Sequence, residues 1–308
     1  MGRCGVRPAR RYGAALVATT AAVAVALPAS TAEAASGPEV TGAKGAFLLD
    51  SGSDRQLWSK DADTRRQMAS TTKVMTATVV LDTPGVDLDK QVTIKQSYRD
   101  YVERNGASTA DLRTGDKMTV RQLLYGLLLP SGCDAAYALA DTFGSGGTEA
   151  QRTASFIGKM NKRASELGMK NTRYDSFDGI SRAGANYTTP RDSAELARHA
   201  LANTTFGTVV RTASTQQKAA NVHRTYYWDN TNKLLGSYRG AIGIKTGTGT
   251  AAGPCLVFAA KRDGRTVVGV ILDDAANRYP DAVKMLDWAY RTKSDVKLRR
   301  LPASAQQD

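Results

Sequence analysis

The sequence predicts an α+β fold in which a mostly antiparallel sheet, flanked by helices, is built from both ends of the chain. Strand-like segments occur near residue 46 and again between residues 222 and 272, whereas the segments between them have the apolar spacing of helices. This order indicates one sheet with an inserted all-helical lobe. The chain has 308 residues, of which 42% are hydrophobic, so it is long enough to bury a substantial core.

The first 34 residues have the pattern of a signal peptide. Several arginines lie within residues 3–11, an apolar stretch follows at 13–27, and Ala32-Glu33-Ala34 forms a small-x-small cleavage site. A transmembrane anchor is the alternative, but it would need about 20 apolar residues. We therefore expect cleavage before Ala35 and an exported mature protein.

The expected elements follow in order along the chain. Residues 46–50 and 56–58 form an opening hairpin, and an apolar helix over 70–81 ends before Pro84-Gly85. Further helices are expected at 119–129, 134–143, 150–167, 191–201 and 281–290, and strands at 222–228, 241–248, 254–261 and 266–272. Asp134 is expected to cap its helix, and Asp263-Gly264 to form the turn between the last two strands.

These elements predict one catalytic domain over residues 35–293. Its α/β lobe would comprise about residues 35–69 and 205–293, its helical lobe about residues 70–204, and residues 294–308 would form a polar tail.

Composition narrows the classes of site and partner. Three cysteines and two histidines exclude a disulfide-stapled mini-protein, a zinc-ribbon array and a His-rich metal cluster, so any metal site would have to be built mostly from carboxylates. We expect neither a metal nor an organic cofactor. The formal charge of +13 comes from scattered basic residues, which makes nucleic acid a poor partner for an exported protein. Loose electrostatic contact with a membrane surface or an anionic wall polymer is one interpretation, and a solvated basic surface is the other.

Ser70-Thr71-Thr72-Lys73 is the first motif with a chemical meaning. The spacing of three residues places the Ser70 hydroxyl and the Lys73 amine on one face of a helix, a nucleophile beside a possible base. Unpaired N–H groups at the helix start would point towards a group bound at Ser70. Alone the motif is weak, because Ser70 could be an N-cap and Ser294-Asp295-Val296-Lys297 also matches it.

Two further motifs strengthen this interpretation. Ser131-Gly132-Cys133 lies in a turn between two apolar helices, and Lys245-Thr246-Gly247 lies on an expected strand. In this order, the three motifs resemble those of the penicillin-recognising active-site serine enzymes, best the low-molecular-mass D-alanyl-D-alanine peptidases. The resemblance covers about residues 45–290 and is strongest to the streptomycete DD-transpeptidases, which also carry Ser-Gly-Cys. It implies the fold shared by β-lactamases and DD-peptidases.

The resemblance also implies a role for each motif residue. Ser70 would attack the penultimate D-Ala of a peptidoglycan stem peptide with Lys73 as base, and Ser131 would relay the proton to the leaving amine. Lys245 and Thr246, with Gly247, would bind the terminal carboxylate. The N–H groups of Ser70 and Thr248 would form the oxyanion hole. β-Lactam antibiotics would be inhibitors, and the protein would lie at the cell wall or the outer face of the cytoplasmic membrane.

Cys133 departs from the usual family pattern, in which an Asn can bind the substrate amide. A thiol is a weak hydrogen-bond partner, so a substrate-binding role for Cys133 is in question. A thiol near two lysines could be unusually reactive, or it could be a small packing residue. A Cys133–Cys255 disulfide is a third alternative in an exported protein.

Three other functions are compatible with parts of the sequence. A class A β-lactamase needs Glu-x-x-Leu-Asn, but Glu166 is followed by Leu167-Gly168-Met169-Lys170, so we expect slow deacylation of penicillin. A Ser-His-Asp hydrolase is disfavoured because Gly-x-Ser-x-Gly is absent, and His199 and His223 are expected to be structural or exposed. A non-catalytic penicillin-binding or wall-binding module would not need the complete set of motif residues.

Overall fold

The computed structural model describes residues 2, 9, 37–275 and 277–305, apart from the side chain of residue 304. Except for residues 2 and 9, the expected signal peptide lies outside these ranges and stays a prediction. Within the described ranges, no helix combines the length and the apolarity that a membrane span requires.

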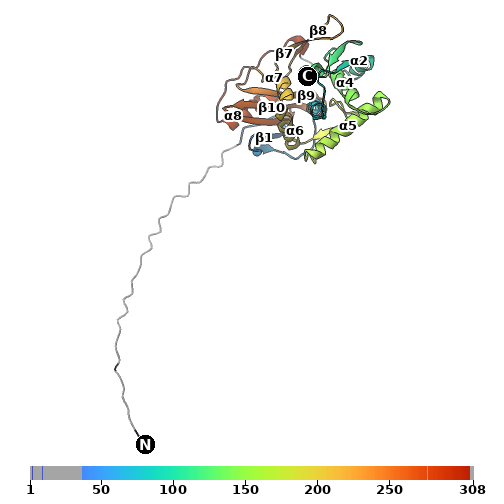
Figure 1. The fold of residues 1–308 in the computed structure, drawn as a ribbon. Coiled ribbons are helices and arrows are strands. Elements are labelled where there is room, and N and C mark those ends of the chain that lie inside the picture. The colour runs from blue at the N-terminus through green and yellow to red at the C-terminus, as the bar shows by residue number, and fades with distance from the viewer. Residues whose placement is uncertain (1, 3–8, 10–36, 276, 306–308) are drawn as a thin grey trace. The chain divides into compact units, whose positions relative to one another are not determined.

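The main sheet has five strands in the order β2-β1-β11-β10-β9, and every neighbouring pair is antiparallel. The strands are β1 (Ala43–Asp50), β2 (Arg55–Lys60), β9 (Ala241–Gly249), β10 (Gly253–Arg262) and β11 (Arg265–Asp274). The N-terminal strand β1 pairs directly with the C-terminal strand β11, as Figure 1 shows. The predicted fold class is confirmed.

Local turn chemistry fixes two of the strand pairings. Asp263 and Gly264 join β10 to β11, and both have positive φ (49° and 78°), as a two-residue hairpin turn requires. Between β1 and β2, the Asp50 carboxylate accepts hydrogen bonds from the N–H groups of Gly52 and Ser53. Both hairpins therefore form where the sequence predicts them.

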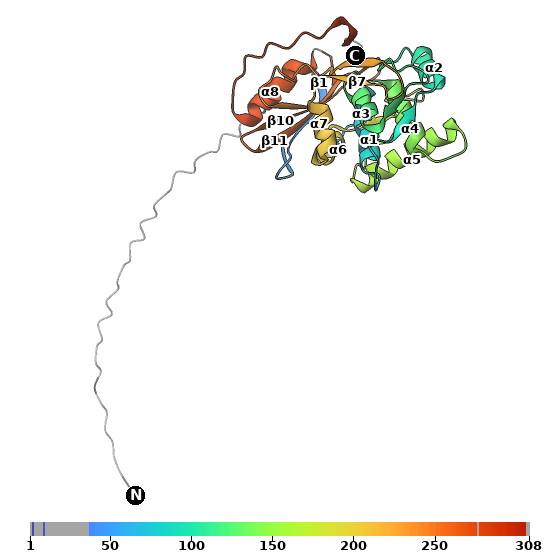
Figure 2. The same cartoon turned by 45° about the horizontal axis from the view of Figure 1, so that its top comes forward.

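Helices cover both faces of this sheet. α8 (Arg278–Tyr290) packs on β10 and β11, whereas α6 (Pro190–Ala202) packs on β1 and β11 and α7 (Thr204–Arg211) on β9 (Figure 2). In β1, Leu48 belongs to the apolar cluster under α8, and its neighbours Phe47 and Leu49 belong to the cluster on the other face. Successive strand residues point to opposite faces, so the sheet is buried on both sides.

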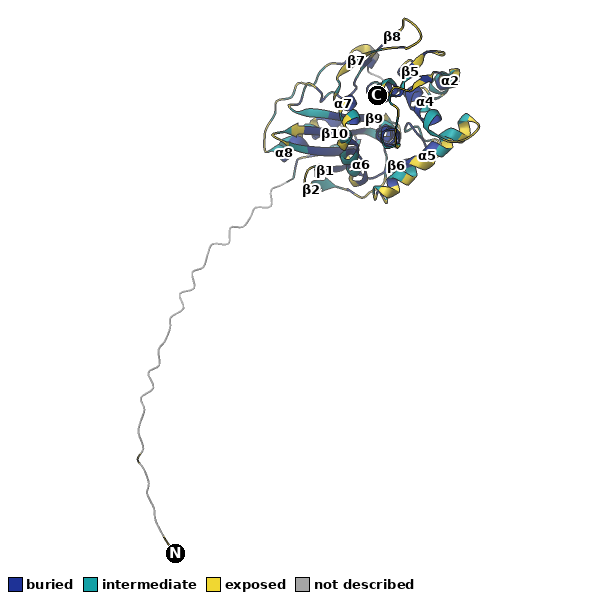
Figure 3. Cartoon of the chain, in the orientation of Figure 1, coloured by how far each residue is buried: buried dark blue, intermediate teal, exposed yellow. Residues whose placement is uncertain are grey.

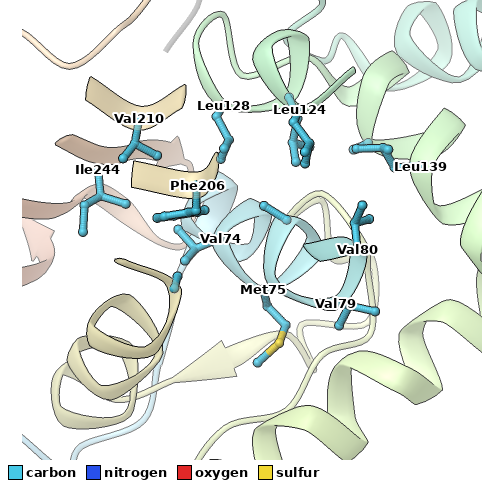
Figure 4. Close-up of a cluster of buried hydrophobic side chains, with 14 of the residues drawn as sticks. Val74, Met75, Val79, Val80, Leu124, Leu128, Leu139, Phe206, Val210 and Ile244 are labelled. Carbon is cyan, nitrogen blue, oxygen red and sulfur yellow. The ribbon is translucent and has the colours of Figure 1, made fainter. Parts of the chain in front are cut away.

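The helix α1 (Lys73–Leu81) lies at the centre of the larger cluster (Figure 4). All its residues are buried, including Lys73, which explains why its sequence has apolar residues on every face. The sheet strands β9 and β10 are also buried over most of their length (Figure 3). Side chains from several elements pack around it, among them Leu128, Leu139, Phe206 and Ile244. Lys73 is therefore a buried lysine at the start of a core helix.

The remaining elements include some that the sequence analysis did not predict. The other helices are α2 (Gln96–Asn105), α3 (Val120–Leu128), α4 (Cys133–Phe143) and α5 (Glu149–Glu166). Short ladders join β3 (Arg66–Gln67) to β6 (Tyr187–Thr188), β4 (Gln91–Thr93) to β5 (Lys117–Thr119), and β7 (Ser214–Lys218) to β8 (Thr225–Asp229). α2 was missed because Tyr98 is its one buried residue, which leaves no apolar stripe to detect.

Asp134 does not have the expected capping role. α4 begins at Cys133, with Gly132 as its N-cap. The buried Asp134 carboxylate instead accepts hydrogen bonds from the N–H groups of Ala110 and Leu112 and from the Thr109 hydroxyl. The side chain thereby fixes the loop before β5 against the start of α4.

Candidate active site

Ser70 lies in a single 3₁₀ turn, η1 (Ala69–Thr72), that leads directly into α1. Its Oγ accepts a hydrogen bond from Lys73 Nζ at 2.9 Å. Ala69 has a φ of 44°, and Gly179 packs so tightly on the turn that a Cβ there would lie 2.1 Å from the Ala69 carbonyl oxygen. Any residue with a Cβ at position 179 would clash with this turn, so the close packing requires glycine.

Lys73 is completely buried, and its amine contacts three groups from three segments. Besides Ser70 Oγ, Nζ donates to the Asp178 carbonyl oxygen at 2.9 Å and lies 3.4 Å from Cys133 Sγ. These three contacts hold the amine in place. The predicted nucleophile and base are thus brought into direct contact.

Ser131 occupies the turn between α3 and α4 in a left-handed conformation, with φ of 65°. Its carbonyl oxygen accepts from Ser108 Oγ at 2.7 Å, which holds the turn. Its own Oγ is buried, and among the described residues it has no hydrogen-bond partner. A buried hydroxyl without a partner is costly in a purely structural role, so the group is available to a bound substrate.

Cys133 is a buried free thiol beside Lys73 and Ser108. Burial raises its pKa to about 12, although the Lys73 charge acts in the opposite direction. Of the alternatives for Cys133, these contacts favour a small packing residue over an unusually reactive thiol, because desolvation of the thiolate outweighs the nearby Lys73 charge. Cys255 is also free and buried, which excludes the Cys133–Cys255 disulfide from this structure.

The third motif lies on the edge strand β9. Lys245 Nζ donates to the Thr246 carbonyl oxygen at 2.9 Å, and Thr246 Oγ1 lies 2.6 Å from Thr231 Oγ1. A Cβ on Gly247 would lie only 3.0 Å from the backbone nitrogen of Ser70, so glycine lets β9 run close against η1 without a shift of either segment. The first and third motifs are therefore neighbours, as are the first and second through Lys73 and Cys133.

A cleft of about 480 Å³ opens over this junction. Ser70, Cys133 and Thr248 line it, and so does Ser108, which the sequence analysis did not identify. Lys73, Ser131, Lys245, Thr246 and Gly247 are buried around the junction and are absent from its lining. Some of the predicted site residues thus line the cleft, and the others are buried next to it.

Two more residues escaped the sequence analysis because no local pattern marks them. The buried Asp178 carboxylate accepts from Tyr101 Oη at 2.8 Å and from the Ile180 N–H at 3.0 Å, which fixes the carbonyl that Lys73 contacts. Arg278, the first residue of α8, donates to the Gly247 carbonyl oxygen at 2.8 Å and to Thr248 Oγ1 at 2.9 Å. It thereby adds a cation at the end of the third motif.

The residues of the alternative functions lie elsewhere. Glu166 ends α5 and pairs with Arg163 at 2.9 Å, and it does not line the cleft. His199 Nε2 lies 2.8 Å from Asp82 Oδ2, and His223 lines a separate surface hollow. Within the described part of the chain, no cluster of His, Cys, Asp and Glu is arranged to bind a metal ion.

Comparison with known proteins gives consistent matches. A family model described as D-alanyl-D-alanine carboxypeptidase matches residues 31–276. A D-alanyl-D-alanine carboxypeptidase of Streptomyces sp. strain K15 is 51% identical over 288 residues, which cover 91% of this chain and 98% of that protein. The crystal structure of the Streptomyces K15 DD-transpeptidase has a TM-score of 0.81 at 52% identity, covering 83% of this chain and 99% of that one. The structure of a D-alanyl-D-alanine carboxypeptidase from Mycobacterium tuberculosis H37Rv has a TM-score of 0.72 at 29% identity, covering 86% and 96%.

The burial of both thiols gives a first prediction. With pKa values raised to about 12 for Cys133 and about 11 for Cys255, the folded mature protein should not react with Ellman's reagent at pH 8 within minutes. Both thiols should react after unfolding in guanidinium chloride, because exposed thiols have pKa values near 8.5. Rapid modification of either thiol in the folded protein would contradict the buried, protonated state.

Proposed function

Because the chain belongs to the D-alanyl-D-alanine carboxypeptidase family, we propose that it acts on peptidoglycan stem peptides ending in D-Ala-D-Ala through a Ser70 acyl-enzyme. Members of this family are penicillin-sensitive serine peptidases with carboxypeptidase or transpeptidase activity. The observation that carries the proposal is the 2.9 Å hydrogen bond between Ser70 Oγ and Lys73 Nζ, with the lysine completely buried.

In the proposed reaction, Lys73 acts as a neutral amine and accepts the proton of Ser70 as Oγ bonds to the carbonyl carbon of the penultimate D-Ala. The C–N bond to the terminal D-Ala then breaks, and the leaving amine takes a proton relayed by Ser131. The unpartnered Ser131 hydroxyl supports this role. The N–H groups of Ser70 and Thr248 would stabilise the oxyanion.

We assign the terminal carboxylate of the substrate to Lys245 and Thr246, with Gly247 keeping the strand close to Ser70. The neighbouring Arg278 adds positive charge, which supports this assignment. Cys133 would contribute by contacting Lys73, since a protonated thiol offers a substrate amide little. Acyl transfer to water gives the carboxypeptidase product, and transfer to an amine gives the transpeptidase product.

We further propose that the protein is exported and acts outside the cytoplasmic membrane, where its substrate lies. The signal-peptide pattern of residues 1–34 and the basic charge of the chain support this location and a loose contact with anionic surfaces. A β-lactamase function is disfavoured because Glu166 is ion-paired at the end of α5, away from the cleft. We therefore assign to no residue the role of activating a water that would hydrolyse the penicilloyl-enzyme.

The acyl-enzyme predicts a single, lasting adduct with penicillin. After brief exposure to benzylpenicillin, intact-mass measurement of the mature protein should show one penicilloyl group that persists through a chase of hours. Ser70→Ala should show none, whereas Ser294→Ala, in the second Ser-x-x-Lys sequence, should be labelled like the parent. An adduct that is lost rapidly with release of penicilloate would indicate a β-lactamase instead.

The Ser131 assignment predicts a loss of activity without a loss of stability. Ser131→Ala removes a hydroxyl that has no partner among the described residues, so its free energy of unfolding should change by less than about 1 kcal/mol. Its rate of hydrolysis of a D-Ala-D-Ala peptide should fall about 10²- to 10⁴-fold. Ser97→Ala, which removes another unpartnered hydroxyl in α2, is the matched control and should keep full activity. Normal hydrolysis by a folded Ser131→Ala variant would refute the proposed proton relay.

A further inference from the structure

A second hollow of about 540 Å³ adjoins the cleft at Thr248, which lines both. It lies between the start of α8 and residues 298–301 of the C-terminal segment, and we call it the basic groove. Four cationic residues line it, and its described lining contains no acidic residue: the cations are Lys233, Arg278, Arg299 and Arg300. This excess of positive charge favours an anionic occupant.

Two of these cations already have structural roles. Arg278 binds the Gly247 carbonyl oxygen and Thr248 Oγ1. Arg299 is half-buried and donates through Nη2 to the carbonyl oxygens of Asn230 and Asn232, and burial lowers its pKa. Both residues build the wall of the groove and contribute charge at a fixed position.

The other two cations, Lys233 and Arg300, are available to a ligand. Neither has an ion-pair partner among the described residues. Lys233 Nζ lies 6.0 Å from the centre of the Tyr279 ring, and Arg278 Cζ lies 5.5 Å from the same centre, so the two cations share one aromatic wall. The side chains of Lys233 and Arg300 remain partly solvated until a ligand binds, so the unliganded protein does not bear the free-energy cost of burying these two charges.

The C-terminal segment holds Arg300 at the groove. The Arg299 N–H donates to Ser237 Oγ at 2.8 Å, and the next residue but one, Leu301, is buried. Arg300 is thus fixed at the backbone on both sides while its side chain stays exposed. A cation placed in this way loses little additional freedom when it binds a ligand.

The groove lies in the direction in which an acceptor peptide would extend from the acyl-enzyme. In the proposed reaction, an acceptor amine attacks the acyl carbon from the place that the leaving D-Ala amine has vacated. The leaving residue has its carboxylate at Lys245 and Thr246, and Thr248 and the groove lie next along β9. An acceptor peptide whose amine reaches the acyl carbon therefore extends towards the groove.

We propose that the basic groove binds a carboxylate of the acceptor peptide and so favours acyl transfer over hydrolysis. The proposal rests on the Ser70 acyl-enzyme and adds to it a site for the second substrate. The ligand class is a peptide amine that carries a free carboxylate. Lys233 and Arg300 are the residues that discriminate, because a neutral acceptor gains nothing from them.

The test compares two acceptors that differ only in the charge of the far end, triglycine and triglycinamide. The mature enzyme is given an N-acylated tripeptide donor ending in D-Ala-D-Ala, and the ratio of transfer product to hydrolysis product is measured for each acceptor. Lys233→Gln/Arg300→Gln should lower this ratio about three- to tenfold for triglycine and leave it unchanged for triglycinamide. The preference of the parent enzyme for triglycine should shrink as salt is raised, because partly exposed charges are screened.

Lys297→Gln is the matched control, since it removes one exposed cation of the same C-terminal segment outside the groove. Benzylpenicillin labelling of every variant shows whether Ser70 still forms an acyl-enzyme, so failure of the proposed function is distinguished from failure of the groove. An unchanged triglycine ratio in the double variant would overturn the proposal. An equal fall for both acceptors would also overturn it, because the groove would then act on the donor or on the fold. Retention of inorganic polyphosphate that depends on both residues, with unchanged ratios, would assign the groove to a wall polymer instead.

Discussion

The structure is organised around one buried lysine. Lys73 begins a helix whose residues are all buried, and a lysine in such a place is tolerated only when acceptors surround its amine. Here the acceptors are Ser70 Oγ, the Asp178 carbonyl oxygen and Cys133 Sγ. Each comes from a different segment, so satisfying the lysine also places the nucleophile, the loop before β6 and the start of α4 relative to one another.

Close backbone contacts then determine what surrounds the nucleophile. Gly179 packs on the Ala69 carbonyl from one side, and Gly247 packs on the Ser70 nitrogen from the edge of the sheet. A Cβ would clash at Gly179 and would be tightly packed at Gly247, so the 3₁₀ turn of Ser70 lies closely between a loop and a strand. If substrate groups bind along β9 as proposed, they lie within reach of Ser70 Oγ. The basic groove continues the same strand edge beyond Thr248.

How far the sequence predicts this site depends on the kind of contact. The spacing of Ser70 and Lys73 is enough to predict their contact, because residues three apart share one helical face. The meeting of all three motifs came from the family resemblance, since contacts between residues 60 or more positions apart leave no periodic signal. Asp178 acts through a main-chain carbonyl and Arg278 through contacts with β9, so neither had a recognisable pattern. The sequence left the state of Cys133 open because burial, which outweighs the adjacent charge, is a property of the tertiary structure.

The most direct test of this account is the rate of acylation by benzylpenicillin after Lys73→Met, which removes the amine and keeps a side chain of similar length. Lys159→Met, on the exposed face of α5, is the control, and thermal unfolding shows that each variant is folded. If the buried amine activates Ser70, acylation of the folded Lys73→Met protein should be about 10²- to 10⁴-fold slower than that of the control. A folded Lys73→Met protein that is acylated at the rate of the control would contradict the account.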